Sequence, residues 1–263
     1  MRNIHTRGRN VEIPECVDEL TEKQYEYYIV LSAALSQERI TPEYFRVRWM
    51  SYLIGLKEVD LTILRQEYVD ELLGQMDALD AFLIREIIDG KECLRLNFET
   101  GRNLLPEYKG YSGPGDMLHG VSFGEFTECF TLLEGMASAP AEEIESGLRR
   151  IARVLYHIPE SERVPEIVAF HAPRFFGSVW GIIQKMPVEI NGREIDLRII
   201  FRSSGSKRAD DRTGWEGIKF EVASAGLFGN VRDVEREDLW TVLLYLYKCK
   251  FEYLEEQKNQ SKK

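Results

Sequence analysis

The sequence predicts a mainly α-helical protein with a single β-hairpin in its C-terminal half. Apolar residues recur at intervals of three and four along much of the chain, and helix-capping signals precede several of these stretches. The pair Asn191-Gly192 favours a type I′ turn and stands between two short apolar stretches, which predicts the hairpin near residues 187–201. With 44% hydrophobic residues among 263, the chain can bury a sizeable core.

Two helices are expected at the start of the chain. Thr21 and Gln24 have the spacing of a capping box, in which a hydroxyl and an amide satisfy free N–H groups at the start of a helix over about residues 22–36. Thr41 and Pro42 have the pattern of an N-cap and a first-turn proline, which begin the second helix. Because the loop between them is short, we expect an antiparallel pair.

The pattern is less regular from residue 60 onward. The apolar spacing is helical from Asp60 to about Ile88, as one long helix or as two helices broken at Gly74. Residues 93–98 alternate between apolar and polar, which leaves a short strand as one reading there.

The chain divides into three expected regions. Glycine, proline and tyrosine dominate between residues 100 and 121, where neither a helical nor a strand period is sustained. We therefore expect an N-terminal helical region over residues 1–99, a Gly/Pro/Tyr-rich connector over residues 100–121, and a C-terminal helical region with the hairpin over residues 122–263.

The C-terminal region contains further helical patterns. Ser122 and Glu125 repeat the capping-box spacing, and another helix should follow and end before Pro159. Pro165 and Pro173 interrupt the apolar stretch at residues 164–185, so two short helices are expected there. Beyond the hairpin, the polar residues 202–213 predict a mobile loop, and residues 215–225 are weakly helical.

A last helix should run from about Asp233 to Gln257, with acidic residues early and lysines late, as the helix dipole prefers. Its first half has almost no polar face and should be buried. Its second half keeps only a narrow apolar stripe at Phe251 and Leu254. This stripe is the candidate partner-binding surface, and packing against its own domain is the alternative.

The net charge of −10 argues against several kinds of partner. A chain this acidic repels a phosphate backbone, so nucleic acid is not expected as the main partner. No stretch approaches the roughly 18 apolar residues that span a bilayer, and no signal peptide follows Met1, so we expect a cytoplasmic protein without a membrane partner. The basic arm at residues 1–10 should be solvated and frayed.

The residue types that carry catalysis or bind metals form no recognisable set. The histidines have no i, i+4 partner, the cysteines form no C-x-x-C pair, and the glycines at 110–115 do not lead into a phosphate-binding helix. No catalytic residue, cofactor or metal site is therefore expected. The histidines and cysteines concerned are His5, His119, His157, His171, Cys16, Cys93, Cys129 and Cys249.

Three stretches of the chain resemble a known group of proteins. They are Asn103–Phe126 (NLLPEYKGYSGPGDMLHGVSFGEF), Ala223–Glu256 (ASAGLFGNVRDVEREDLWTVLLYLYKCKFEYLEE) and Glu15–Tyr28 (ECVDELTEKQYEYY). They resemble uncharacterised proteins encoded in the tail-morphogenesis region of bacterial phages and prophages. Some of these proteins occupy the position of a tail assembly chaperone, between tail-tube and tape-measure genes. The L-Y-x-P pattern of that group departs here by one residue, at Leu155–Pro159.

The resemblance implies a non-enzymatic protein that binds phage structural or tail proteins, as an assembly chaperone or a minor virion component, in the cytoplasm of the bacterial host or in the virion. It transfers no catalytic or binding residue. Two other classes of function stay open. One is a cytoplasmic adaptor or regulatory binding protein, and the other is an enzyme with a dispersed active site, for which a deep pocket of convergent ionisable groups would be the sign.

Overall fold

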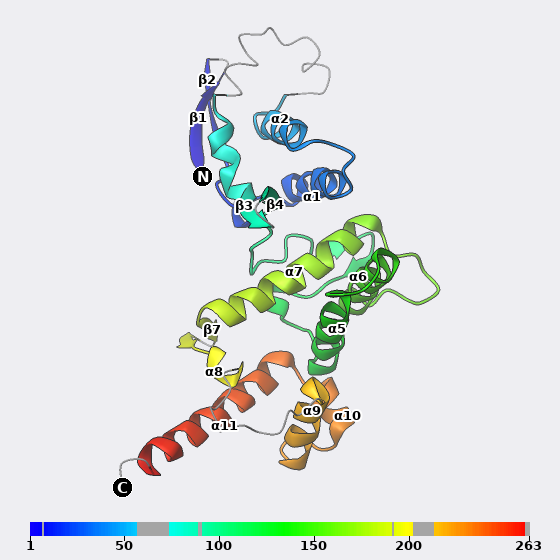
Figure 1. Ribbon diagram of the computed structural model, residues 1–263, viewed down its shortest axis with the longest axis vertical. Coiled ribbons are helices and arrows are strands. Elements are labelled where there is room, and N and C mark those ends of the chain that lie inside the picture. Colours follow the sequence, from blue (N-terminus) through cyan, green and yellow to red (C-terminus); the bar gives the residue numbers. More distant parts are fainter. Residues whose placement is uncertain (7, 57–73, 89–90, 191, 202–212, 261–263) are drawn as a thin grey trace.

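The computed structural model describes residues 1–6, 8–56, 74–88, 91–190, 192–201 and 213–260, and confirms the mainly α-helical fold (Figure 1). The helices in these ranges are α1 (Glu22–Ser36), α2 (Pro42–Leu53), α5 (Phe123–Met136), α6 (Ala141–Leu155), α7 (Glu166–Lys185), α8 (Arg198–Phe201), α9 (Gly214–Ser224), α10 (Val231–Arg236) and α11 (Leu239–Gln260). Short 3-10 helices are η1 (Val17–Glu19), η2 (Met76–Phe82) and η3 (Asp116–Leu118).

The strands form small antiparallel hairpins. Their members are β1 (Arg2–Thr6) with β2 (Arg9–Ile13), β3 (Leu83–Ile88) with β4 (Lys91–Leu96), β5 (Glu107–Tyr108) with β6 (Tyr111–Ser112), and β7 (Val188–Ile190) with β8 (Arg193–Ile195). Along the long axis of the molecule, β1, β2, α1 and α2 lie at one end, α5, α6 and α7 in the middle, and α9, α10 and α11 at the other end (Figure 1). One cluster of buried apolar side chains runs through all three parts.

The two predicted N-terminal helices are confirmed. Thr21 Oγ1 accepts the N–H of Gln24 at 3.3 Å, and Gln24 Oε1 accepts the N–H of Thr21 at 2.9 Å, which completes the capping box of α1. At the start of α2, Thr41 Oγ1 accepts the N–H of Tyr44 at 3.2 Å, and Pro42 occupies the first turn as expected. The two helices pack through aromatic rings, with Tyr27 stacked on Tyr52 at a centroid distance of 4.0 Å. Such pairs stabilise by about 0.5–1.5 kcal/mol beyond the area they bury.

The predicted helix from Asp60 to Ile88 is wrong at its end. Residues from Leu83 onward form β3, which pairs with β4 in the register Ile84↔Arg95. The β-branched residues at 84, 87 and 88 favour an extended backbone, and pairing with β4 satisfies the N–H and C=O groups that a helix would otherwise satisfy. The strand reading of residues 93–98 is thereby confirmed over most of its length. Residues 57–73 of the predicted helix lie outside the described residues.

The N-terminal arm is a hairpin, so the prediction of a frayed end over residues 1–10 is wrong. β1 and β2 pair from Arg2↔Ile13 to Thr6↔Arg9. Ile4 and Ile13 are buried in the core, and their burial anchors the two strands. The prediction failed because charged and polar residues surround Ile4 in the sequence and give no clear apolar pattern.

Helix α7 is unbroken, so the prediction of two short helices over residues 164–185 is wrong. Pro173 removes an N–H inside the helix and its ring crowds the carbonyl of Ala169, four residues earlier. Next to this defect, Arg174 Nη1 donates to the carbonyl of Phe170 at 2.8 Å. Apolar side chains are buried on both sides of the proline, and this packing holds the two halves in one helix.

The helices around α7 follow the predicted pattern. Ser122 Oγ accepts the N–H of Glu125 at 3.2 Å, and Glu125 Oε2 accepts the N–H of Ser122 at 2.8 Å, so the second capping box is present at the start of α5. α6 ends at Leu155, before Pro159 as expected. α5 packs on α6, and α6 packs on α7.

The predicted hairpin is confirmed where β7 pairs with β8. Val188 pairs with Ile195, and Gly192 has the positive φ of +72° that the turn requires. Asn191 lies outside the described residues, as do residues 202–212 of the mobile loop predicted over 202–213. The end of the predicted hairpin region is wrong, because residues 198–201 form α8. Asp196 Oδ1 accepts the N–H of Arg198 at 3.1 Å, which turns the chain away from the strand.

The predicted last helix is two helices, and the expectation of one from Asp233 to Gln257 is wrong. α10 ends at Arg236 and α11 begins at Leu239. Between them the backbone pairs with the start of α5: Glu237 O accepts the N–H of Phe123 at 2.8 Å, and the N–H of Leu239 reaches Val121 O at 3.0 Å. These bonds divert the backbone from helical pairing. The helical prediction for residues 215–225 is confirmed by α9.

The segment at residues 100–121 packs into the core. Leu104, Leu105 and Leu118 are buried, and a Cβ on Gly113 would lie 2.5 Å from the ring of Tyr156. The glycine is therefore needed for close packing of the loop on α6. The division into three regions stays a prediction.

Candidate functional site

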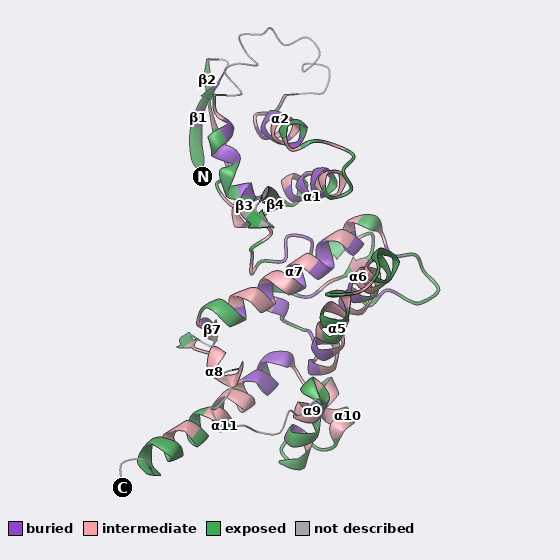
Figure 2. Ribbon diagram, viewed as in Figure 1, coloured by how far each residue is buried: buried purple, intermediate pink, exposed green. Residues whose placement is uncertain are grey.

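The predicted partner-binding residues lie on the outer half of α11. Figure 2 shows that burial falls along this helix toward its C-terminal end. Leu239 and Leu243 are buried, as expected for the first half. Phe251 is 48% exposed and Leu254 is partly buried. Phe251 stacks on Tyr247 at a centroid distance of 6.1 Å. The binding role of the stripe stays a prediction.

His171 is fully buried at the centre of a polar network that joins α1, the 103–118 loop and α7. Its Nδ1 lies 2.7 Å from Tyr25 Oη, and its Nε2 lies 3.0 Å from Asn103 Oδ1. Asn103 is itself fixed, because its Oδ1 accepts the N–H of Leu105 at 2.9 Å and its Nδ2 donates to Pro114 O at 2.6 Å.

The partners of His171 define its protonation state. Since Asn103 Oδ1 can only accept, Nε2 of His171 carries the hydrogen and Nδ1 accepts from the Tyr25 hydroxyl. Burial lowers the pKa of His171 to about 3, so the imidazole is neutral. Both ring nitrogens are satisfied by neutral groups, which assigns His171 a structural role. Among the described residues, no cluster of three or more His, Cys, Asp and Glu side chains is placed to hold a metal ion.

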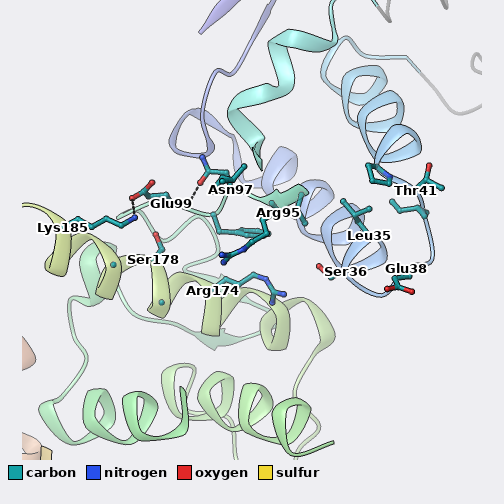
Figure 3. A pocket seen from close by; sticks show the side chains of 17 residues that line it. Leu35, Ser36, Glu38, Thr41, Arg95, Asn97, Glu99, Arg174, Ser178 and Lys185 are labelled. Atoms are coloured by element: carbon teal, nitrogen blue, oxygen red, sulfur yellow. Dashed lines mark hydrogen bonds and ion pairs between the residues drawn. The ribbon is translucent and has the colours of Figure 1, made fainter. Parts of the chain in front are cut away.

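A groove of about 910 Å³ lies between α7 and the N-terminal part of the molecule (Figure 3). Its walls are the α1–α2 corner from Leu35 to Pro42, the hairpin residues Ile84 and Arg95, and the segment Asn97–Glu99. Its floor is one face of α7. The volume lies within the range of about 300–1,000 Å³ that is usual for ligand pockets.

Three contacts hold one wall of the groove against α7. Ser178 Oγ accepts the N–H of Thr100 at 2.7 Å and donates to its carbonyl at 2.8 Å. Lys185 Nζ forms an ion pair with Glu99 at 3.1 Å. The guanidinium of Arg174 lies over the ring of Phe98, 5.5 Å from its centroid. Residues 174, 178 and 185 lie on one face of the helix because their spacing follows the helical period.

The floor between these contacts is open. Gly177 and Gly181 both line the groove, and a Cβ added to either would meet no atom within 4 Å. Their lack of a side chain is therefore not required by packing within the described residues. It leaves the backbone of α7 accessible from the groove.

Arg174 is the unusual charge of the site. Its guanidinium carbon lies 3.4 Å from the centroid of Phe170, and Nη1 donates to the carbonyl of the same residue. Within the described part of the chain, no carboxylate lies within ion-pair distance of Arg174. Burial lowers its pKa to about 10, so the guanidinium stays charged at neutral pH. A partly buried charge without a counter-charge is costly, and a bound anion would offset that cost.

Arg174 borders two separate hollows. Arg174 also lines a second cavity of about 520 Å³ between α1, α6 and α7. Figure 3 shows its side chain reaching from α7 toward the end of α1, where Ser36 and Glu38 lie. Glu38 and Glu99 line the same groove, but Glu99 is engaged by Lys185.

No sequence motif singles out Arg174. One signal is nevertheless present: between Glu166 and Lys185, Arg174 is the one Lys, Arg, Asp or Glu residue in a mostly apolar stretch. A lone charge at such a position is rarely buried without a partner. The aromatic side chain at Phe98, far away in sequence, could not be paired with it from local patterns.

Comparisons with protein-family models, with curated proteins and with solved structures gave no match to this chain. Among the described helices, none is both long enough and apolar enough to cross a bilayer.

Proposed function

We propose that the protein is a non-enzymatic phage or prophage tail-morphogenesis protein that acts by binding another tail protein, as an assembly chaperone or a minor virion component, in the host cytoplasm or the virion. The tail assignment rests on the resemblance of residues 15–28, 103–126 and 223–256. The observation that supports protein binding is the groove over α7, which combines apolar walls, an open glycine floor and an arginine that pairs with no carboxylate among the described residues.

Binding explains this groove better than catalysis does. The charged side chains that line it are Glu38, Arg95, Glu99, Arg174 and Lys185. Neither histidine nor cysteine is among its lining residues in the described part of the chain, and the Ser178 hydroxyl is occupied by both backbone groups of Thr100. A nucleophile paired with a base, which hydrolytic chemistry requires, does not converge there.

The test is affinity capture of the full chain from phage-producing bacteria, with the bound proteins identified by mass spectrometry. Enrichment of tail-tube, tape-measure or other structural tail proteins over an unrelated acidic bait is the expected result. Reproducible capture of host regulatory proteins without tail proteins would favour the alternative, a cytoplasmic adaptor. Failure to enrich any protein would contradict a binding function.

A further inference from the structure

We propose that the groove over α7 binds a short acidic segment of the partner protein, whose carboxylate pairs with Arg174. This inference rests on the proposed protein-binding function and adds the place of binding and the chemistry of the ligand.

The charges along the groove differ in how they are compensated. Its charged lining residues are Glu38, Arg95, Glu99, Arg174 and Lys185. The Lys185 charge is compensated by Glu99, whereas no described carboxylate compensates Arg174. An anionic group of a ligand beside Arg174 would therefore supply the counter-charge that no described residue provides within ion-pair distance.

The surroundings of Arg174 leave its donors available. Phe170 lies against the guanidinium and restricts the plane of the group. Among the described residues, the backbone carbonyl of Phe170 accepts from Nη1, and no hydrogen bond engages the other guanidinium nitrogens. A guanidinium has five N–H groups in a planar fork, and this fork matches the two oxygens of a carboxylate. The pre-set orientation reduces the entropy that is lost on binding.

The dimensions fit a peptide. Arg174 and Lys185 are separated by three turns of α7, which corresponds to roughly 16 Å at about 1.5 Å per residue. An extended chain of about five residues covers this length. Gly177 and Gly181 lie along the path and let a ligand backbone approach the helix closely.

The walls also favour a peptide over a small anion. Leu35, Ile84 and Phe98 line the groove beside the charged residues, and the groove is open to solvent rather than enclosed. A segment with an acidic residue next to apolar residues would cover both kinds of wall. A small anion would engage Arg174 alone and leave the apolar walls exposed.

The test uses the full chain and a displayed library of random seven-residue peptides. The most enriched peptide is synthesised with a fluorescein label, and its binding is measured by fluorescence polarisation. We expect enriched peptides to share an Asp or Glu at one position. Arg174→Met should weaken binding at least about tenfold, which corresponds to about 1.4 kcal/mol. Gly181→Leu, which fills the floor, should weaken it to a similar degree.

Two matched controls separate the groove from general effects of substitution. Arg150→Met removes an exposed arginine of α6 that pairs with Glu128, and Gly135→Leu makes the glycine substitution at an exposed site of α5 with open space around it. Both should bind the peptide like the wild type. Gly181→Leu replaces a helical glycine with a better helix former, and its Cβ would meet no atom within 4 Å, so it should fold even if Arg174→Met does not.

Several results would overturn the proposal. Enriched peptides without an acidic residue, no enrichment at all, or full binding by both groove variants would each do so. Binding of N-acetylglutamate as tight as that of the peptide would make the groove a small-anion site instead. In the capture experiment, equal capture of tail proteins by the wild type and by Arg174→Met would support the proposed function and refute the groove as the binding site. Arg174-dependent peptide binding without any captured tail protein would support the groove as a peptide site and contradict the proposed tail function.

Discussion

Acidification should destabilise the protein through His171. In the folded chain, burial lowers the pKa of this imidazole to about 3, whereas in the unfolded chain it returns to about 6.5. Below pH 6.5 the unfolded state therefore binds one proton more at this site, and the free energy of unfolding falls as the pH falls. Between pH 7 and pH 5 this single group should lower the free energy of unfolding by about 2 kcal/mol, because the folded pKa lies below this range.

Urea unfolding of the wild type and of His171→Gln, measured from pH 7 to pH 5, tests this reasoning. At pH 7 the variant should be less stable, because Tyr25 and Asn103 lose a well-placed partner. From pH 7 to pH 5, the free energy of unfolding of His171→Gln should fall by about 2 kcal/mol less than that of the wild type. His119→Gln, at an exposed position, should keep the wild-type dependence. If His171→Gln also kept the wild-type pH dependence, the loss of stability in acid would not come from the buried histidine.

Three other substitutions or truncations give direct tests. Gly113→Ala should destabilise by about 1–3 kcal/mol in urea unfolding, because its Cβ would lie 2.5 Å from the Tyr156 ring; wild-type stability would contradict that packing. Gly192→Val should lower the melting temperature, since a β-branched residue resists the φ of +72°, and an unchanged value would count against the turn. Deletion after Lys250 should cost less than the roughly 2–5 kcal/mol of a core anchor, because Phe251 is 48% exposed. If the truncated protein captured the same partners as the wild type, the stripe at Phe251 and Leu254 would not be a binding surface.

Elements whose signals are local could be predicted from the sequence. The capping boxes at Thr21 and Ser122 involve atoms three residues apart, and both form as expected. Pro42 at the first turn of α2 and Gly192 in the hairpin turn act through their own backbone angles. In each case the interaction that decides the structure is contained in the pattern itself.

Elements decided by distant contacts could not be predicted. Leu83–Ile88 has helical spacing but pairs with β4, and Pro173 is tolerated because α7 is packed on both sides of it. The break before Leu239 depends on hydrogen bonds to the start of α5. The groove has the same origin, because Arg174 acquires its aromatic neighbour Phe98 and its facing wall only after the chain has folded.

The bond between Tyr25 and His171 sets an order of events during synthesis. The two residues are 146 positions apart. At a translation rate of about 5–20 residues per second, the ribosome needs roughly 7 to 30 seconds to add His171 after Tyr25. During that time α1 exists without the helix that covers its buried face, and its apolar side chains remain open to other proteins in the cell. The buried face of α1 is therefore completed only after α7 has been made.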